Sequence, residues 1–378
     1  MQKKALIVAN FIGFFHFLWD DIDILNSMGY QVYALGDNGL NENHTLKKME
    51  EKNVIFIDAR LDAKSPITHN NLNYYRKVKA VLKEYDFNLI HCHTPIAGLI
   101  VRWAARKYRN AGTKVIYTTH GLAYTHLSSK KEYLIYHTIE SFASRFCDAI
   151  ITINKEDYES ASKLHCKHVF HINGVGVDTK KFGTVNIDRD AYRKQLGVSP
   201  NKIMVLAIGE LSYRKNHIIV AKALSKMKNK RDFVFAICGR EMTAGGTGDE
   251  IRQYSEKYGV NTVFLGFRQD IPEIIKCADM GVMPSIREGL GLSGIEMLSE
   301  GIPLVGSDVQ GIREYIIEGE TGFLCNPFDA EAFAAGILKL SSPDVRNMMK
   351  QRCIRIAQKF DSNVSVKQRK DIYNTIMK

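Results

Sequence analysis

Residues 284–311 read PSIREGLGLSGIEMLSEGIPLVGSDVQG and follow a short apolar run at 280–283. This order predicts the end of a buried strand, a glycine-rich turn and a short helix. The helix is expected to end at Gly301, where a C-terminal glycine cap is typical. Glu288 then stands in the turn and Glu296 on the helix. A strand, turn and helix in this order indicate a parallel α/β sheet.

The turn has features of a site for a phosphorylated ligand. Gly289 and Gly291 have no side chains, so their backbone can approach a ligand closely. The first N–H groups and the positive dipole end of the helix attract anions. A carboxylate on each side suits hydroxyl groups near a phosphate, which favours a nucleotide-sugar. The alternative is an ordinary glycine-rich turn of a doubly wound sheet with solvated glutamates.

Length and composition indicate a soluble two-domain protein. The chain has 378 residues, 45% hydrophobic and 25% charged. The net charge of +11 is spread over both halves, which argues against a nucleic-acid-binding tail. An anionic substrate and an anionic membrane surface remain possible partners.

Two further observations predict a cytoplasmic protein. The seven cysteines are scattered without a C-x-x-C pair, as in a protein with reduced thiols. The N-terminal apolar run resembles a signal peptide, but Asn10, Gly13 and His16 interrupt it. We therefore expect a first buried strand, a loop and an amphipathic helix to Met28. We find no apolar stretch long enough to span a bilayer.

Short apolar runs alternate with helical patterns along the whole chain, which predicts parallel strands with crossover helices. Strands are expected at 4–9, 31–35, 54–57, 88–91, 114–118, 148–152, 167–171, 203–208, 233–237, 262–265, 280–283 and 303–306. Helices of the first half are expected at 14–28, 70–84, 96–108, 130–146 and 154–164, and two more follow Asp329.

The best boundary lies in the Asn- and Gly-punctuated segment 171–182. We predict an acceptor-binding domain at 1–174 and a nucleotide-sugar-binding domain at 175–360. The terminal helix at 361–378 should pack back on the first domain. Both domains are expected to be Rossmann-like and doubly wound, with ligands at the carboxyl ends of their strands in a central cleft.

Six motifs in order resemble one family. EGLGLSGIE (288–296) resembles the E-x₇-E motif of family-four retaining glycosyltransferases, which have the two-domain GT-B fold. The resemblance covers nearly the whole chain. Within the family, the chain resembles the subgroup that builds capsular and exopolysaccharide repeat units. The other matching segments are HCHTP (91–95), YTTHG (117–121), ITINKEDY (151–158), INGVGVD (172–178) and GIREYIIEGETGFL (311–324).

The resemblance implies roles in donor binding. Glu288 would contact the donor sugar and Glu296 the ribose. The backbone N–H groups of Gly291, Leu292 and Ser293 would bind the diphosphate.

GELSYRKNH (209–217) matches the family's basic phosphate clamp. Lys215 matches its lysine, but Glu210 replaces the usual arginine, and Arg214 is a candidate for the missing charge. Arg268, in GFRQDIP (266–272), would lie along the base. For these three basic residues the alternative is a solvated surface position.

In the first domain the resemblance implies that Gly13 lets the diphosphate approach and that His120 hydrogen-bonds the donor sugar near the reaction centre. A turn glycine and a structural histidine are the alternatives. His91 and His93 fall on one face of a strand, which would permit a metal pair. Further ligands at suitable spacing are missing from the sequence, so no metal is predicted.

The implied reaction retains the anomeric configuration. The bond from the anomeric carbon to phosphate breaks first, and the acceptor hydroxyl enters from the same face. The leaving phosphate takes the acceptor proton, so neither a protein nucleophile nor a cofactor is required. The protein acts through positive charge on the diphosphate.

Two basic segments bear on the nature of the acceptor. They are RWAARKYRNAGTK (102–114) and YYRKVKAVLK (74–83), and both also contain aromatic residues. Basic helices with interleaved aromatics suit an anionic membrane surface. The family's acceptors are often polyprenyl-diphosphate-linked saccharides, in agreement with such a surface. Solvated helix faces are the alternative, and no nucleic-acid motif accompanies the charge.

We therefore predict a cytoplasmic retaining glycosyltransferase, peripheral on the inner face of the cell membrane. It would move a hexose or N-acetylhexosamine from a UDP-sugar to a lipid-linked saccharide. Alternatives are a GT-B UDP-sugar epimerase and a non-catalytic nucleotide-sugar-binding subunit of a membrane complex. A Rossmann dehydrogenase is disfavoured because the first strand is not followed by G-x-G-x-x-G.

Overall fold

The computed structural model of the protein describes residues 2–39, 42–63, 68–241 and 246–378. The chain forms two compact units. The first extends to Val175 and includes Asn363–Lys378, and the second is Gly176–Ser362. The sequence prediction placed the boundary after residue 174 and the terminal helix with the first domain. The two units are described separately below.

The first unit contains a seven-stranded parallel sheet in the order β3-β2-β1-β4-β5-β6-β7. Its strands are β1 (Lys3–Phe11), β2 (Tyr30–Asp37), β3 (Ile55–Asp58), β4 (Leu89–His93), β5 (Lys114–Thr118), β6 (Ala149–Thr152) and β7 (His168–His171). The run Ala5–Ala9 in β1 is fully buried, as expected for a parallel strand covered on both faces. The strand order reverses between β1 and β4.

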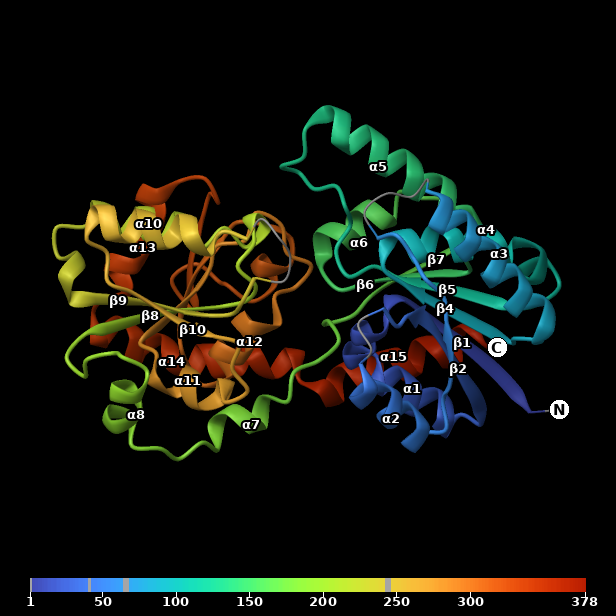
Figure 1. Ribbon diagram of the computed structural model, residues 1–378, viewed down its shortest axis with the longest axis horizontal. Coiled ribbons are helices and arrows are strands. Elements are labelled where there is room, and N and C mark those ends of the chain that lie inside the picture. Colours follow the sequence, from blue (N-terminus) through green and yellow to red (C-terminus); the bar gives the residue numbers. More distant parts are fainter. Residues whose placement is uncertain (1, 40–41, 64–67, 242–245) are drawn as a thin grey trace. The chain divides into compact units, whose positions relative to one another are not determined.

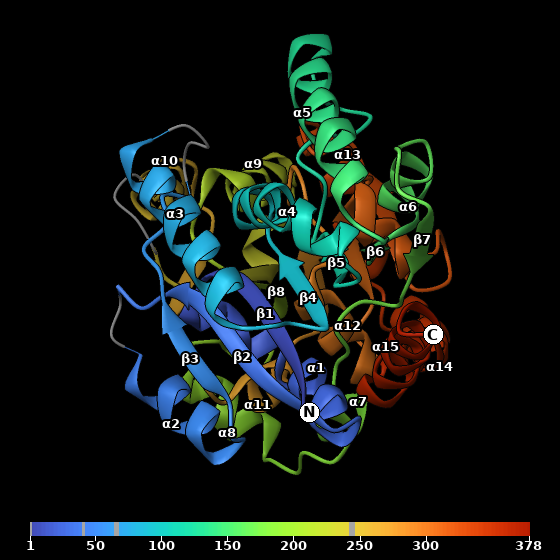
Figure 2. The same cartoon turned by 90° about the vertical axis from the view of Figure 1, so that its right-hand side faces the viewer.

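Helices cover both faces of this sheet. In Figures 1 and 2, α3 and α4 lie on one face, and α1 and α2 lie on the other. The helices of the unit are α1 (Trp19–Ser27), α2 (Asn43–Glu51), α3 (His69–Glu84), α4 (Pro95–Asn110), α5 (Lys130–Ala143), α6 (Lys155–Ala161) and α15 (Ser362–Ile376). Apolar residues of α3 and α4, among them Val78 and Val101, pack with Leu6 and Ile90 of the sheet in one continuous core.

The second unit repeats this architecture with a six-stranded parallel sheet in the order β10-β9-β8-β11-β12-β13. Its strands are β8 (Ile203–Ile208), β9 (Phe233–Cys238), β10 (Thr262–Gly266), β11 (Met280–Met283), β12 (Leu304–Ser307) and β13 (Gly322–Cys325). Here the order reverses between β8 and β11, so the sheet is doubly wound. Ligands of such sheets bind at the carboxyl ends of the strands beside the reversal.

The helices of the second unit again lie on both sides of the sheet, with α10 and α13 on one face and α11 and α14 on the other (Figure 1). They are α7 (Thr179–Gly183), α8 (Arg189–Gln195), α9 (Ile218–Lys226), α10 (Gly248–Tyr258), α11 (Ile271–Cys277), α12 (Leu292–Ser299), α13 (Ala330–Leu340) and α14 (Pro343–Ala357). The predicted fold class, two Rossmann-like parallel α/β domains, is confirmed.

A buried polar network attaches α15 to the first unit. The Arg369 guanidinium donates to the Asp21 carboxylate at 2.6 Å and to Asp20 at 2.9 Å. The Tyr373 hydroxyl donates to the other Asp21 oxygen at 2.8 Å and lies 2.6 Å from Nδ1 of His91 in β4. Because both ions of the Arg369–Asp21 pair are nearly excluded from solvent, each depends on the other for its charge to be compensated.

Several details of the predicted secondary structure are wrong. Three helices were not predicted: α2 (Asn43–Glu51), α7 (Thr179–Gly183) and α8 (Arg189–Gln195). The sequence analysis missed β13, whose four residues begin with Gly322 and lie at the sheet edge. Such a short segment has too few alternating positions to show a strand period. The predicted loop and helix over 14–28 are instead a 3-10 helix, Ile12–Phe17, followed by α1. Leu18 leaves the helical region between them, with φ −117° and ψ 5°.

Within the described ranges, no helix is long and apolar enough to cross a bilayer. All seven cysteines are free thiols, and six of them are buried.

Candidate functional site

The loops after β8 and β11 lie at the strand reversal of the second sheet and are hydrogen-bonded to each other. The N–H of Ile286 donates to the carbonyl of Arg214 at 2.9 Å. Asn216 adopts a left-handed conformation, and its buried amide donates to the carbonyls of Pro284 and Pro327. These bonds fix the predicted clamp segment against the glycine-rich turn.

Glu288 lies at the centre of this contact. Its Oε2 accepts a hydrogen bond from Lys215 Nζ at 2.6 Å and from the Ser285 hydroxyl at 3.1 Å. Arg214 Nη1 lies 3.3 Å from the same oxygen, and Arg214 Nη2 lies 3.1 Å from Oε1 of Glu210. The structure therefore brings together three of the predicted site residues, and Arg214 spans the distance from Glu210 to Glu288.

The charge of Glu288 is held by its neighbours. Burial by itself would raise the pKa of this carboxyl. The Lys215 and Arg214 charges and the hydrogen bonds from Lys215 and Ser285 outweigh burial and hold the pKa of Glu288 below its usual value. The cluster thus contains an ionised carboxylate with two cations at its edge.

Two glycines give this cluster its shape. A Cβ on Gly209 would lie 3.2 Å from Cε of Lys215, so the lysine stem runs directly over the end of β8. Gly291 begins α12 with φ 80°, a conformation that favours glycine. A Cβ there would lie 2.7 Å from Cε of Met283 and 3.0 Å from Cγ of Glu288.

Helix α12 is placed with its N-terminus at the end of β8, because the Ser293 hydroxyl donates to the Ile208 carbonyl at 3.2 Å. The first N–H groups of a helix, here those around Leu292 and Ser293, have no intrahelical acceptor. They and the helix dipole form an anion-attracting end. The predicted end at Gly301 is confirmed by a Schellman motif, in which Gly301 and Ile302 donate to the carbonyls of Leu298 and Met297.

Glu296 lies on the second turn of α12 and is half-buried. Its carboxylate makes no hydrogen bond or ion pair with another residue that the structure describes. Burial raises the pKa of Glu296, and the Lys181 charge offsets this only in part. A half-buried carboxylate without a hydrogen-bond partner in the protein is available to accept hydrogen bonds from a ligand.

Arg268 is outside the cluster. It follows β10, two strands from β8, and its guanidinium is bound by both oxygens of Asp270. The hydroxyl of Tyr192 also donates to Asp270. The hydrogen bond from Arg268 and that from Tyr192 hold the pKa of Asp270 far below its usual range, against the effect of burial. A role for Arg268 along the base stays a prediction.

Gly13 lies inside the 3-10 helix after β1. A Cβ on it would lie 2.6 Å from a carboxylate oxygen of Glu42 and 3.0 Å from the ring of Phe11. The close packing of Glu42 and Phe11 against Gly13 therefore already requires a residue without a side chain at this position. Approach of a diphosphate to Gly13 stays a prediction.

His120 follows β5 and lies in a row of histidine rings. Its Nε2 is 3.1 Å from Nδ1 of His93, and the His93 ring lies 4.1 Å, centroid to centroid, from that of His91. The ring of Phe14 packs edge-on against His120 at 4.9 Å. Nε2 of His93 is buried without a hydrogen-bond partner in the described part of the chain.

The strand reversal of the first sheet lies next to this row. Thr94, directly after β4, has φ 64°, which is rare for a residue with a side chain. Its hydroxyl donates to Oδ1 of Asn10 in β1 at 2.7 Å, and the same oxygen accepts from the N–H of Ala97. A non-glycine residue held in such a conformation is a feature of functional sites.

The metal pair that strand spacing would permit at His91 and His93, and that was not predicted, is also disfavoured by geometry. Both ring nitrogens of His91 are hydrogen-bonded, to Tyr373 and to Thr118. Among the described residues, no three His, Cys, Asp or Glu side chains are grouped as metal ligands. His91 serves instead to connect β4, β5 and α15.

The histidine row makes stability depend on pH. Burial lowers the pKa of His91 to about 4, with the Arg369 charge adding to the effect and Asp21 opposing it. Burial also lowers the pKa of His120 to about 4. The folded protein thus keeps both rings neutral as pH falls below 6.5, whereas the unfolded chain takes up protons there. Stability should therefore fall between about pH 6.5 and 4.

We expect His91→Gln to make the fall in thermal stability between pH 7 and pH 5 shallower, by about 2 kcal/mol. Glutamine does not titrate but can still bond both hydroxyls. Melting curves of wild type and variant at the two pH values measure this. His44→Gln, at an exposed histidine, is the control and should follow wild type. Equal pH dependence in all three proteins would show that His91 is not protonated on unfolding.

The sequence analysis missed three residues that shape the cluster around Glu288. Ser285 bonds Glu288, Asn216 joins the two loops, and the Tyr315 hydroxyl donates to the Gly291 carbonyl at 3.3 Å. Ser285 stands three positions before Glu288, a spacing that suits a turn contact. Asn216 directly follows Lys215, and asparagine tolerates the left-handed conformation. No local pattern singles out Tyr315.

The predicted basic face of 102–114 needs correction. Arg102 is fully buried, bonded to Glu140 at 3.0 Å and lying over the Tyr117 ring. Arg109 is paired with Asp148 at 2.9 Å. Consecutive basic residues of a helix point in different directions, so a charge run in the sequence is not one charged surface.

Comparison with known families accounts for this arrangement. Residues 188–360 match the family model "Glycosyl transferases group 1", and residues 25–181 match "Glycosyltransferase Family 4". The chain belongs to the family-four glycosyltransferases. The sequence motifs of this glycosyltransferase therefore predicted both its family and its GT-B fold correctly.

Curated relatives extend the match over the full chain. A Bacillus subtilis protein with the name "Putative glycosyltransferase EpsD" is 33% identical over 100% of this chain and 98% of its own. An Escherichia coli enzyme is 28% identical over 82% of each chain. Its name is UDP-Gal:alpha-D-GlcNAc-diphosphoundecaprenol alpha-1,3-galactosyltransferase.

Solved structures agree on the fold. Anabaena Alr3699/HepE, crystallised with UDP and glucose, superposes with a TM-score of 0.79 at 20% identity, over 99% of this glycosyltransferase and 100% of that chain. A glycosyltransferase from Rickettsia africae superposes with a TM-score of 0.76 at 18% identity, over 100% and 99% of the two chains.

Proposed function

We propose that this glycosyltransferase moves a hexose or N-acetylhexosamine from a UDP-sugar to a polyprenyl-diphosphate-linked saccharide, with retention, in exopolysaccharide or capsule assembly. One observation carries the proposal: Lys215 and Arg214 converge on Glu288 beside the N-terminus of α12. The E. coli relative, whose name specifies a UDP-sugar and a lipid-linked acceptor, supports the choice of substrates.

The cluster suits the departure of a diphosphate. When the anomeric bond to phosphate breaks, negative charge grows on the leaving diphosphate. The Lys215 ammonium, the Arg214 guanidinium and the N–H groups of Leu292 and Ser293 are preorganised donors for that charge. Glu288 holds both cations in place before the donor arrives and can accept a hydrogen bond from a sugar hydroxyl.

Arg214 is proposed to replace the arginine that the family carries at the Glu210 position. Its guanidinium is half-exposed and bridges Glu210 and Glu288, so it lies at the cluster and not in bulk solvent. Glu210 tethers this side chain and lowers the local positive charge. A bound diphosphate would compete with Glu210 for the guanidinium.

Glu296 is proposed to bind the ribose hydroxyls. Because its folded-state pKa is raised, its ionised form costs stability at neutral pH, and this cost disappears as pH falls through the folded pKa. We expect Glu296→Gln to leave thermal stability at pH 7 equal or higher while weakening UDP binding about tenfold, since hydrogen bonds to a charged acceptor are lost. Melting curves and calorimetric titration with UDP measure the two effects. A variant that melts earlier and binds UDP normally would assign Glu296 a structural role.

His120 is proposed to hydrogen-bond the donor sugar. The lowered pKa of its ring keeps it neutral at physiological pH, so it acts as a hydrogen-bond partner and not as a cation. The resemblance to the family further implies that no metal is needed. Turnover should then be unchanged by a chelator.

The test is UDP release from a panel of UDP-, GDP- and ADP-sugars, with and without a lipid-linked acceptor extract. Acceptor-dependent release from one UDP-sugar supports the transferase. Conversion of the donor without acceptor would support the epimerase. UDP binding without turnover, in protein of native stability, would support the non-catalytic subunit.

The proposed acceptor lies in a membrane, so we also propose a peripheral position on the inner face of the cell membrane.

A further inference from the structure

The N-terminal half of α5 is exposed on all sides. In residues 130–136 every side chain is exposed, and Figures 1 and 2 show this end of α5 projecting from the first unit. Four consecutive residues of this segment are large and apolar or aromatic, with exposed fractions of 43% for Tyr133, 66% for Leu134, 47% for Ile135 and 42% for Tyr136. We name these four residues the α5 tip.

Local interactions hold this segment as a helix. The Ser129 hydroxyl accepts from the N–H of Glu132, and the Glu132 carboxylate accepts from the N–H of Ser129, which is a capping box. The Tyr133 ring packs on Tyr124 at 5.1 Å and stacks with His137 at 5.5 Å. The tip is therefore ordered without a core of its own, and its apolar surface is not buried by the unit that carries it.

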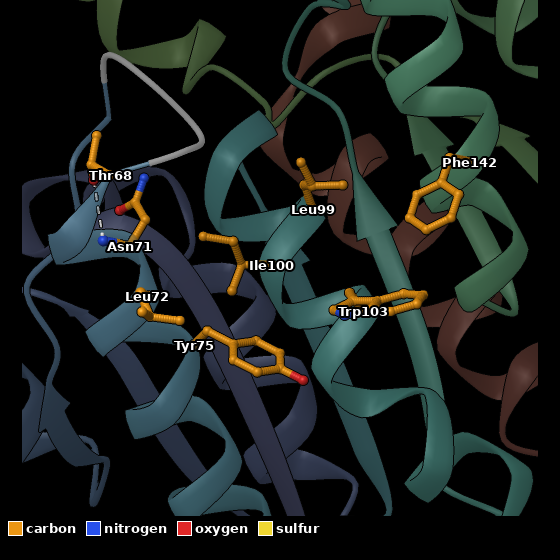
Figure 3. Close-up of a pocket in the computed structure, with 8 residues that line it drawn as sticks. All are labelled: Thr68, Asn71, Leu72, Tyr75, Leu99, Ile100, Trp103 and Phe142. Carbon is orange, nitrogen blue, oxygen red and sulfur yellow. Dashed lines mark hydrogen bonds between the residues drawn. The ribbon is translucent and has the colours of Figure 1, made fainter.

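A second apolar feature adjoins the other end of α5. Figure 3 shows a pocket between α3, α4 and α5, with a volume of about 350 Å³. Its lining is mainly apolar and consists of Thr68, Asn71, Leu72, Tyr75, Leu99, Ile100, Trp103 and Phe142. Phe142 belongs to α5, so one helix carries both the tip and a wall of the pocket.

Positive charge borders both features. Lys130 and Lys131 open the helix and are separated from the tip by Glu132, whose carboxylate is bound in the capping box; they lie at a helix N-terminus, where the dipole disfavours cations. At the pocket, the Arg106 guanidinium lies 4.1 Å from the Trp103 ring and the Lys79 ammonium 5.8 Å from the Tyr75 ring. An anionic partner would compensate the positive charge of Lys130 and Lys131, which the helix dipole disfavours at this end.

The arrangement favours a bilayer over a protein partner. Successive residues of a helix are about 100° apart, so four consecutive apolar side chains point to every side of α5. A groove on a second protein covers one face of a helix, whereas lipid surrounds it. Tyrosine and tryptophan next to lysine and arginine are typical of the interface between lipid tails and headgroups.

We propose that the α5 tip inserts into the interface of an anionic bilayer, with Lys130 and Lys131 on the lipid phosphates and the pocket at Trp103 facing the lipid. This inference extends the proposed function by assigning the surface that contacts the membrane. Its test measures binding and not turnover, so the two can fail separately.

The first experiment is co-sedimentation of the full chain with phosphatidylcholine vesicles with and without phosphatidylglycerol. Wild type should bind the anionic vesicles and bind the neutral ones at least about tenfold more weakly. Leu134→Glu with Ile135→Glu should reduce anionic-vesicle binding at least about tenfold. The matched control is Leu338→Glu with Met348→Glu, two exposed apolar residues of the second unit at 52% and 75%, which should bind like wild type.

The fluorescence of Trp103 provides an independent measurement of contact with lipid. The chain has two tryptophans, so Trp19→Phe leaves Trp103 as the reporter. Vesicles with brominated phosphatidylglycerol should quench its fluorescence, and the Leu134→Glu, Ile135→Glu changes should abolish this quenching. Quenching by soluble iodide should decrease on vesicle binding.

Four results would overturn the inference. Vesicle binding could be absent, or could be unaffected by the two glutamates. The two glutamates could instead abolish a concentration-dependent dimer seen by analytical ultracentrifugation, which would assign the tip to a second copy of the chain. Equal binding to neutral and anionic vesicles would remove the role of the lysines. Turnover on a short-chain, water-soluble acceptor should be retained by the double variant, which separates membrane binding from catalysis.

Discussion

Lys215→Ala should reduce turnover about 10²–10³-fold, the loss typical of one preorganised donor to a developing negative charge. Lys215 donates to Glu288 at 2.6 Å and is mostly buried, so solvent cannot replace it at that position. The donor KM should also rise, because the lysine is expected to contact the diphosphate before the bond breaks. Steady-state UDP release with the preferred donor measures both parameters.

Lys226→Ala is the matched control. Lys226 belongs to the same unit and is paired with Glu331, but both side chains are well exposed. Exposed pairs contribute little, so this variant should keep its activity and stability. Melting temperatures must accompany the rates, since Lys215→Ala removes a partner from the buried Glu288. Activity of Lys215→Ala within about threefold of wild type, in a folded protein, would exclude the lysine from the reaction.

Arg369→Met should destabilise the first unit by about 3–5 kcal/mol, the usual effect of removing one partner of a buried ion pair. The substitution removes the cation that compensates the Asp21 carboxylate, and Asp21 is too deeply buried for solvent to replace it. It also removes the anchor of α15, whose Tyr373 bonds His91 beside the histidine row. Denaturant unfolding followed by tryptophan fluorescence measures the loss, because both tryptophans, Trp19 and Trp103, belong to the first unit.

Arg352→Met is the control for Arg369→Met. Arg352 is paired with Glu320 at the surface of the second unit, with both side chains well exposed. Its loss should cost at most about 1 kcal/mol. A loss of similar size in the two variants would mean that the α15 network is hydrated or redundant.

The sequence by itself determined the alternation of strands and helices, because buried parallel strands are continuous apolar runs that a local pattern can show. It also determined the turn at 284–311, since glycines at a strand end and a helix start restrict the backbone locally. The E-x₇-E motif and the lysine at 215 identified the family for the same reason: their spacing is local in the chain.

The tertiary structure alone decided which charges meet. Glu288 and Lys215 are separated by 73 positions, and the sequence could not show that they share one hydrogen bond. Arg102 was predicted at a charged surface but is buried on Glu140, which lies 38 positions away. The histidine row is neutral because burial disfavours charge, and burial depends on the packing of α15 from the far end of the chain. Composition and local spacing carry no information on such contacts, because they form only when distant segments fold together.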